Sequence, residues 1–241
     1  MNKTITGMLA ALLFFAIGAG AQTVPTIAPT ATYTDSNGNE QTSSDISESA
    51  PLAVTFQANS DGADGWSAHY EWHFYKEGER DKPYLVRYEE NTSYTFSEAG
   101  SHLVELWAVF VQGTDTIAYT NDYWTQEGTP IQISIAESKL EMPNAFSPNG
   151  DGINDVYKAK EGYKSIVDFH ATIFNRWGQK IYSWDDPAGG WDGTFHGKDV
   201  KQGVYFVLVK AKGADGKKYN IKRDVNLLRG YTETTDNNNA E

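Results

Sequence analysis

Acidic and amide side chains gather in one short segment that has the chemistry to bind a cation. Asn149, Asp151, Asn154 and Asp155 all lie between residues 149 and 155. Oxygen ligands of this kind suit calcium, and Asn149, Asp151 and Asp155 form the candidate set. Their spacing differs from the Asp-x-Asp-x-Asp-Gly pattern of a calcium loop, and Asn and Asp are common turn residues. We therefore favour an Asx-type turn and keep calcium as the weaker alternative.

Other chemistry-bearing pairs give little support for catalysis. His69 and His73 lie in a segment that reads as a strand, where residues four apart are separated by ~13 Å, too far to share a metal ion. The adjacent acids Glu89–Glu90 and Asp185–Asp186 lie in polar turns, where carboxylates are solvated. The sequence also contains no Gly-x-Ser-x-Gly elbow, His-Glu-x-x-His helix, phosphate loop or dinucleotide fingerprint. We expect a protein that is not an enzyme and uses no cofactor.

Four tryptophans in the N-terminal half make carbohydrate binding a second possibility to consider, because exposed aromatic rings can stack on sugars. Trp72 and Trp107 lie within strand-like runs and are expected in the core, whereas Trp66 and Trp124 lie near loops. Aromatic residues in a sandwich without cysteine serve mainly in packing. A carbohydrate-binding or adhesive N-terminal module is therefore kept as the alternative function.

The first residues and the composition indicate export. Lys3, an apolar run over residues 8–17 and the small-residue site Ala19-Gly20-Ala21 predict a signal peptide over residues 1–21. Cysteine is absent, so each module must be stable without disulfides. Residues 1–138 carry 5 Lys and Arg against 18 Asp and Glu, whereas residues 139–241 carry 15 against 14. So negative an N-terminal half makes nucleic-acid binding improbable.

Two modules follow a polar leader. Residues 22–50 are rich in Thr, Ser, Pro and Asn, and we expect a flexible leader or linker with one edge strand near residues 31–34. Residues 51–138 contain short alternating strands separated by turns, which predicts an immunoglobulin-like sandwich. Residues 139–230 contain two hairpins, around residues 175–178 and 213–216, and form a second sandwich. Residues 231–241 are polar and read as a frayed tail. The expected fold class is all-β.

Each module also resembles a known family. Residues 70–74 (Tyr-Glu-Trp-His-Phe) and the segments at 94–96 and 100–104 are similar to the polycystic-kidney-disease (PKD) repeat, although its Gly-Asp-Gly is replaced by Tyr75-Lys76-Glu77-Gly78. In the second module, four blocks follow in order at residues 145–155, 174–179, 191–206 and 225–229. They begin with Ala-Phe-Ser-Pro-Asn-Gly-Asp-Gly, Phe-Asn-Arg-Trp-Gly-Gln, Trp-Asp-Gly and Val-Asn-Leu-Leu-Arg. Together they resemble the type B C-terminal domain of type IX secretion substrates, also called the gliding motility-associated C-terminal domain.

The second resemblance implies delivery to the cell surface. Such domains direct a periplasmic protein through the type IX translocon, and type B members are associated with PorP/SprF-type outer-membrane partners. The protein would then be surface-bound or secreted, either as cargo or as an adaptor of the apparatus. The candidate recognition residues are Asn149, Asp151, Asn154, Asp155, Arg176, Trp177, Trp191, Asp192, Lys217, Lys218, Arg223 and Arg229. Trp177 and Trp191 are both expected to add apolar surface to the core, and Arg176 either to stack on an aromatic ring or to reach a carboxylate.

The cationic hairpin admits two interpretations. Lysines blunt a solvated edge strand against aggregation, and the same side chains suit an acidic partner surface. The residues concerned are Lys210, Lys212, Lys217, Lys218, Lys222 and Arg223. The family also ends near its Leu-Leu-Arg segment, whereas this chain continues from Gly230 to Glu241.

Overall fold

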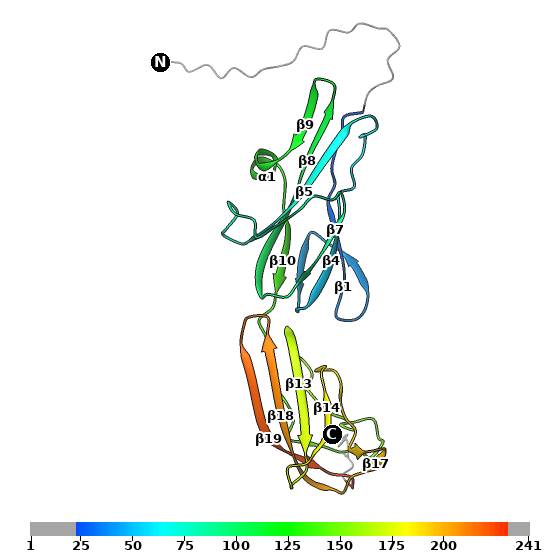
Figure 1. Cartoon of the computed structure of the whole chain (residues 1–241). Coiled ribbons are helices and arrows are strands. Elements are labelled where there is room, and N and C mark those ends of the chain that lie inside the picture. The colour runs from blue at the N-terminus through cyan, green and yellow to red at the C-terminus, as the bar shows by residue number, and fades with distance from the viewer. Residues whose placement is uncertain (1–22, 231–241) are drawn as a thin grey trace, which may run out of the picture.

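Two β-rich units follow one another along the chain in the computed structural model, which describes residues 23–230 (Figure 1). The N-terminal unit ends near residue 136 and the C-terminal unit begins near residue 139. The predicted signal peptide (1–21) and tail (231–241) lie outside the described residues. Within the described part of the chain, none of the helices has the length and apolar content needed to span a membrane.

The N-terminal unit is a sandwich of two sheets. One sheet has the order β2-β1-β4-β7 and the other the order β3-β10-β8-β5-β6, with β9 paired to β8. The strands are β1 (Thr30–Thr34), β2 (Glu40–Thr42), β3 (Asp45–Glu48), β4 (Leu52–Gln57), β5 (Ser67–Lys76), β6 (Leu85–Arg87), β7 (Thr92–Phe96), β8 (Gly100–Gln112), β9 (Asp115–Tyr119) and β10 (Ile131–Ile135).

Period-2 alternation explains how these strands form a core. In β4, Leu52, Val54 and Phe56 are buried while the residues between them are exposed, because successive side chains of a strand point to opposite faces. Phe56 packs on Trp72 and Phe74 of the facing sheet, with ring centroids 5.4 and 5.5 Å apart. Inter-sheet aromatic packing of this kind therefore holds the unit without disulfides.

The expectation that residues 22–50 form a flexible leader with one edge strand is wrong. The predicted edge strand exists as β1, but it lies between β2 and β4, and β3 pairs in parallel with β10. Ala31 and Ile46 are fully buried. The segment is therefore part of the sandwich. Its few apolar residues point into the core, and its backbone hydrogen bonds are made with the neighbouring strands β4 and β10.

A short helix, α1 (Asn121–Gln126), interrupts the strand pattern. Its Trp124 is buried and donates its indole N–H to the carbonyl of Leu106 at 2.9 Å. Trp124 was expected near a loop, and α1 turns it into the sandwich instead. A helix of six residues is too short to produce a periodic signal in the sequence.

The C-terminal unit is built on one larger sheet with the order β11-β19-β18-β13-β14. Two ribbons, β12-β15 and β16-β17, lie outside that sheet. The strands are β11 (Ala145–Phe146), β12 (Tyr157–Lys158), β13 (Ile166–Phe174), β14 (Lys180–Trp184), β15 (Gly190–Trp191), β16 (Thr194–Phe195), β17 (Lys198–Asp199), β18 (Gly203–Gly213) and β19 (Lys218–Leu227). The two predicted hairpins, β13-β14 and β18-β19, are confirmed.

Ribbon residues complete the core of this second unit. Tyr157 and Trp191, paired across the ribbon β12-β15, are fully buried beside Phe146, with the Phe146 and Trp191 ring centroids 5.3 Å apart. They share one cluster with the inward residues of the sheet, such as Ile173 and Val209. The second layer of this sandwich is therefore a ribbon and ordered loops.

The tip of the β18-β19 hairpin contacts the N-terminal unit (Figure 1). Ala99 donates its N–H to the carbonyl of Ala214 at 3.1 Å, and the Ala50 N–H donates to the Ser165 hydroxyl at 3.1 Å. Asp215 accepts hydrogen bonds from the backbone and hydroxyl of Ser138 between the units. These contacts form a junction, and they fix which end of the C-terminal unit faces away from the first module.

Candidate recognition site at the distal end of the C-terminal unit

The end of the C-terminal unit opposite this junction, here called the distal end, brings together segments from all four sequence blocks. It consists of the loop at residues 147–155, the β13-β14 turn, the segment at residues 192–203 and Arg229. Figure 1 shows this end farthest from the N-terminal unit. Blocks that lie up to 80 residues apart in the chain thus form one surface.

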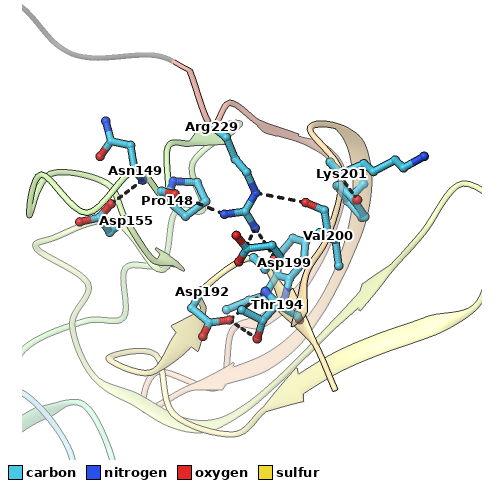
Figure 2. A network of polar contacts seen from close by, with 12 residues as sticks. Pro148, Asn149, Asp155, Asp192, Thr194, Asp199, Val200, Lys201 and Arg229 are labelled. Atoms are coloured by element: carbon cyan, nitrogen blue, oxygen red, sulfur yellow. Dashed lines mark hydrogen bonds and ion pairs between the residues drawn. The ribbon is translucent and has the colours of Figure 1, made fainter. Parts of the chain in front are cut away.

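Arg229 ties the distal loops to one another (Figure 2). Its guanidinium donates to the carbonyls of Gly193 at 2.6 Å, Val200 at 3.1 Å and Pro148 at 3.4 Å. It also lies 3.3 Å from the carboxylate of Asp199. The planar fork of five N–H donors is what allows one side chain to reach three carbonyls in two loop segments at once. Arg229 therefore positions the surface and is itself partly covered by it.

The carboxylate of Asp155 organises the first loop in the same way. It accepts the backbone N–H groups of Asn149 at 2.9 Å, Gly150 at 2.7 Å and Gly152 at 2.8 Å. These donors, that of Gly150 foremost, hold the pKa of Asp155 below its ordinary value because they favour the charged form. The loop is an Asx-turn structure in which Asp155 acts as the internal acceptor.

The remaining acidic and amide residues of the loop bond mainly to one another. Asp151 accepts the N–H of Ile153 and the side-chain amide of Asn149, each at 2.8 Å. Asn154 adopts a positive φ of 55°, a conformation that Asn tolerates, and its carbonyl accepts the Ser147 N–H. Within residues 23–230, no group of three or more His, Cys, Asp or Glu side chains is arranged to hold a metal ion.

Trp191 and Trp177 have opposite environments, although both were expected in the core. Trp191 is fully buried and donates its indole N–H to the Thr194 carbonyl at 2.7 Å, so it supports the surface from within. Trp177 is 75% exposed, and the expectation for it is wrong. It sits at the tip of the β13-β14 turn, beyond the last inward-facing position of β13. The neighbouring Asp192 accepts hydrogen bonds from Thr194 and stabilises the turn after Trp191.

Arg176 stacks on the exposed Trp177 ring. Its guanidinium carbon lies 4.3 Å from the ring centroid, so of the two expected contacts the structure has the cation–π one. Asn175 fixes the turn by accepting the N–H groups of Trp177 at 3.0 Å and Gln179 at 3.1 Å. Gly178 completes it with a φ of 79°, which disfavours side chains.

A groove of about 420 Å³ opens beside this turn. We call it the Trp177 groove; it is lined by residues 175–177, Ile181, Phe195 and residues 200–205. Val204 in its lining is 48% exposed, and Phe206, two residues further along β18, is 43% exposed. Sequence patterns do not single out Lys201, Val204 or Phe206 as site residues. The consecutive apolar residues Val204 to Val209 of β18 indicate two apolar faces, but only the tertiary structure shows which face is left uncovered.

The cationic hairpin lies away from this surface. Lys217 and Lys218 are next to the hairpin tip that contacts the N-terminal unit, with the Lys217 ammonium 4.9 Å from the Tyr219 ring. Arg223 donates to the Met142 carbonyl. β19 pairs with β11 only at Asn226 and Leu227, so most of its outer edge has no partner among the described strands. These features favour the edge-strand interpretation and separate Lys217, Lys218 and Arg223 from the distal end.

The N-terminal candidates for metal or sugar binding have other roles. His69 and His73 lie on one strand with Glu71 between them, which forms contacts of 3.0 and 2.8 Å with the two rings. The His73 ring stacks on Trp107 at 4.2 Å, and the carboxylate of the fully buried Glu105 pairs with Arg80. Trp72 and Trp124 are in the core. Two of the four tryptophans considered for sugar stacking are therefore inaccessible.

Comparisons with known proteins identify the C-terminal unit. Residues 140–223 match the model of the CHU_C type IX secretion signal domain. No curated protein matches the chain. The C-terminal unit is therefore a type IX secretion signal domain, and such a signal implies export to the cell surface or secretion.

Similar solved structures share little sequence with this chain. Dimeric latent PorU from Porphyromonas gingivalis is 11% identical, with a TM-score of 0.27 over 87% of this chain and 20% of PorU. The chicken CNTN1 FN1–FN3 domains are 10% identical, with a TM-score of 0.29 over 77% of this chain and 62% of that one. A tandem repeat from the extending region of a large adhesion protein is 14% identical, with a TM-score of 0.26 over 86% and 68%. This chain thus spans only a fifth of PorU.

Proposed function

From the type IX secretion signal domain at residues 140–223, we propose that the protein docks on a PorP/SprF-like outer-membrane protein through the distal end of this domain. The role is recognition, and the protein is not an enzyme. The N-terminal sandwich is the passenger, or the part through which the protein serves as an adaptor of the export apparatus. Docking of a folded surface requires that its loops be fixed before the partner arrives, since ordering them on binding costs free energy.

One observation carries this proposal: Arg229 at the end of the last block connects the loops of the first and third blocks. The side chain bonds to the Pro148 carbonyl in one segment and to the Gly193 and Val200 carbonyls at the two ends of the β16-β17 ribbon, and no strand pair among the described residues joins these two segments. A domain whose function resided in its sheet would not need to fix the loops of one end. We infer that the conformation of this end is what the export machinery reads.

An export assay with graded truncations tests the proposal. Deletion of residues 221–241 removes most of β19 and Arg229, whereas deletion of residues 231–241 keeps both. We expect the longer deletion to abolish surface display and leave the protein in the periplasm, and the shorter deletion to leave export unchanged. Surface display can be measured by protease accessibility in intact cells.

A point variant separates sorting from folding. Arg229→Lys keeps the charge but cannot reach three carbonyls, so we expect a folded protein with reduced export. Arg87→Lys, on the exposed end of β6 in the N-terminal unit, is the matched control and should export normally. Undiminished surface display of the protein lacking residues 221–241 would contradict the sorting role.

Co-purification distinguishes an adaptor from ordinary cargo. An adaptor should remain bound to an outer-membrane β-barrel after detergent extraction, and its loss should reduce secretion of other substrates. Ordinary cargo would leave the secretion of other substrates intact. The Arg229→Lys variant should weaken the complex in the first case.

A further inference from the structure

We propose that the Trp177 groove binds an extended, acidic segment of the partner that carries an aromatic side chain. The inference rests on the proposed docking role and names the chemistry of the partner at the same end of the domain. The groove has a volume of about 420 Å³, large enough for one aromatic side chain with its flanking backbone.

Exposed apolar surface is concentrated around this groove. Ten large hydrophobic residues are exposed in the described part of the chain, and six of them belong to the C-terminal unit. Three of these six, Trp177, Val204 and Phe206, line or adjoin the groove. Val204 and Phe206 lie on the same face of β18, where Phe206 pairs with Phe174 of β13. Exposed large apolar residues gathered at one end of a domain are typical of a protein-binding site.

The charges around the groove select the partner. Arg176 and Lys201 line it, and no carboxylate does. Among residues 23–230, neither of these two cations forms an ion pair, whereas Asp199 nearby is engaged by Arg229. Residues 139–241 carry 15 Lys and Arg against 14 Asp and Glu, so these two cations give the groove a positive rim in a half of the chain that is close to neutral. An acidic segment complements it, and a basic segment would be repelled.

The shape of the site favours a peptide over a membrane surface. A planar bilayer contacts protruding residues, whereas a groove between a β-turn and residues 200–205 receives a protruding side chain. A peptide segment makes contact only with the local cationic rim.

The walls of the groove are held in place before binding. Tyr205 donates its hydroxyl to the Lys201 carbonyl at 2.7 Å, and Val200 donates its N–H to the Gly193 carbonyl at 3.0 Å. On the opposite wall, Asn175 fixes the Arg176–Trp177 turn through its side-chain carbonyl. Because both walls are preorganised, the groove can bind a segment with little ordering cost.

Three defined peptides test the inference with the chain from residue 22. They are Ac-Ser-Asp-Phe-Asp-Ser-amide, its Lys-Phe-Lys counterpart and its Asp-Ser-Asp counterpart. Binding is followed by the NMR signal of the Trp177 indole N–H, assigned with Trp177→Phe. We expect the Asp-Phe-Asp peptide to shift this signal with a dissociation constant about tenfold lower than either other peptide.

Charge reversal supplies the matched comparison. Arg176→Glu with Lys201→Glu should invert the preference toward the Lys-Phe-Lys peptide. Lys210→Glu with Lys218→Glu changes the net charge equally on the hairpin away from the groove, and should keep the Asp-Phe-Asp preference. No shift with any peptide, equal shifts with all three, or binding to phosphatidylglycerol vesicles without a peptide preference would overturn the inference.

The export assay then distinguishes this inference from the proposed function. The Arg176→Glu, Lys201→Glu protein should remain folded, as judged by its unfolding midpoint, and lose most of its surface display. If it is displayed normally while deletion of residues 221–241 blocks display, sorting holds and the groove inference fails. If both are displayed normally, the proposed function itself fails.

Discussion

The two units of this protein use the same β-sandwich class in different ways. The N-terminal unit surrounds its core with strand-paired sheets on both sides, and its exposed large hydrophobics, Val24, Tyr84, Tyr88 and Val111, are scattered. The C-terminal unit has one larger sheet covered by ribbons and loops, and it leaves Trp177 and its neighbours exposed at one end. The N-terminal unit mainly buries its apolar residues, whereas the C-terminal unit also exposes several of them at its distal end.

The difference shows how a loop-rich layer can be as ordered as a sheet. In the N-terminal unit, backbone groups are mostly satisfied by neighbouring strands. In the C-terminal unit, Asp155 and Arg229 supply the missing partners from side chains, one as acceptor and the other as donor. Buried or partly buried backbone groups need such partners, so the loops adopt one conformation. Preorganised loops suit a recognition surface better than a sheet face does.

Removal of each central tryptophan should give the largest effect on stability. Trp72→Ala and Trp191→Ala each delete a fully buried side chain, and we expect each to destabilise its own unit by about 3–5 kcal/mol. Urea unfolding followed by amide signals from each unit would measure both. Equal loss of both units in either variant would show that they unfold as one body, which would contradict the division into two cores.

Arg229→Ala should destabilise the distal end alone. Three carbonyls lose a donor, and we expect a cost of about 1–3 kcal/mol with faster amide exchange in residues 147–155 and 193–201. Arg87→Ala, on an exposed strand of the N-terminal unit, should change stability by less than about 0.5 kcal/mol. Faster amide exchange in the N-terminal unit of the Arg229→Ala protein would contradict the prediction that the effect is confined to the distal end.

Gly213→Ala should weaken the junction that joins the two units. A Cβ at this position would lie 2.1 Å from the Ser138 hydroxyl and 2.4 Å from the Asp215 carboxylate. We expect a cost of about 1–3 kcal/mol and greater separation between the two thermal transitions. Gly230→Ala, whose Cβ meets no atom within 4 Å, is the control and should leave the calorimetric profile unchanged.

Acid should loosen the junction by a smaller amount. The Ser138 hydroxyl, with the N–H groups of Lys217 and Ser138, lowers the pKa of Asp215 from its ordinary value of 3.8. A lowered folded-state pKa gives stability that is present above pH ~4 and is lost as the pH falls through the folded value. Calorimetry between about pH 5 and pH 2.5 should show this loss, and Asp215→Asn should remove that part of the pH dependence. If the Asp215→Asn protein loses stability with falling pH as the wild type does, Asp215 is not the group responsible.

Local patterns predicted most of the elements but not every partner. The alternation in residues 52–57 and the turn residues around 175–178 placed β4 and the β13-β14 hairpin correctly. Residues 22–50 were misread as a leader because their strands are polar and depend on partners as distant as β10. Trp177 was misread because its type favours burial, while its place at the tip of a turn leaves it exposed.

The sequence by itself determined the β class, the order of the two modules and the resemblance of the second to a sorting domain, because these follow from local periodicity and short ordered blocks. Only the tertiary structure decided that the blocks converge on one end, that Arg229 connects their loops, and that the lysine-rich hairpin tip lies at the opposite end. The physical reason is that these contacts join residues about 30 to 80 positions apart. Local sequence patterns carry no information on which residues so far apart in the chain will meet. The packing of the core brings them together.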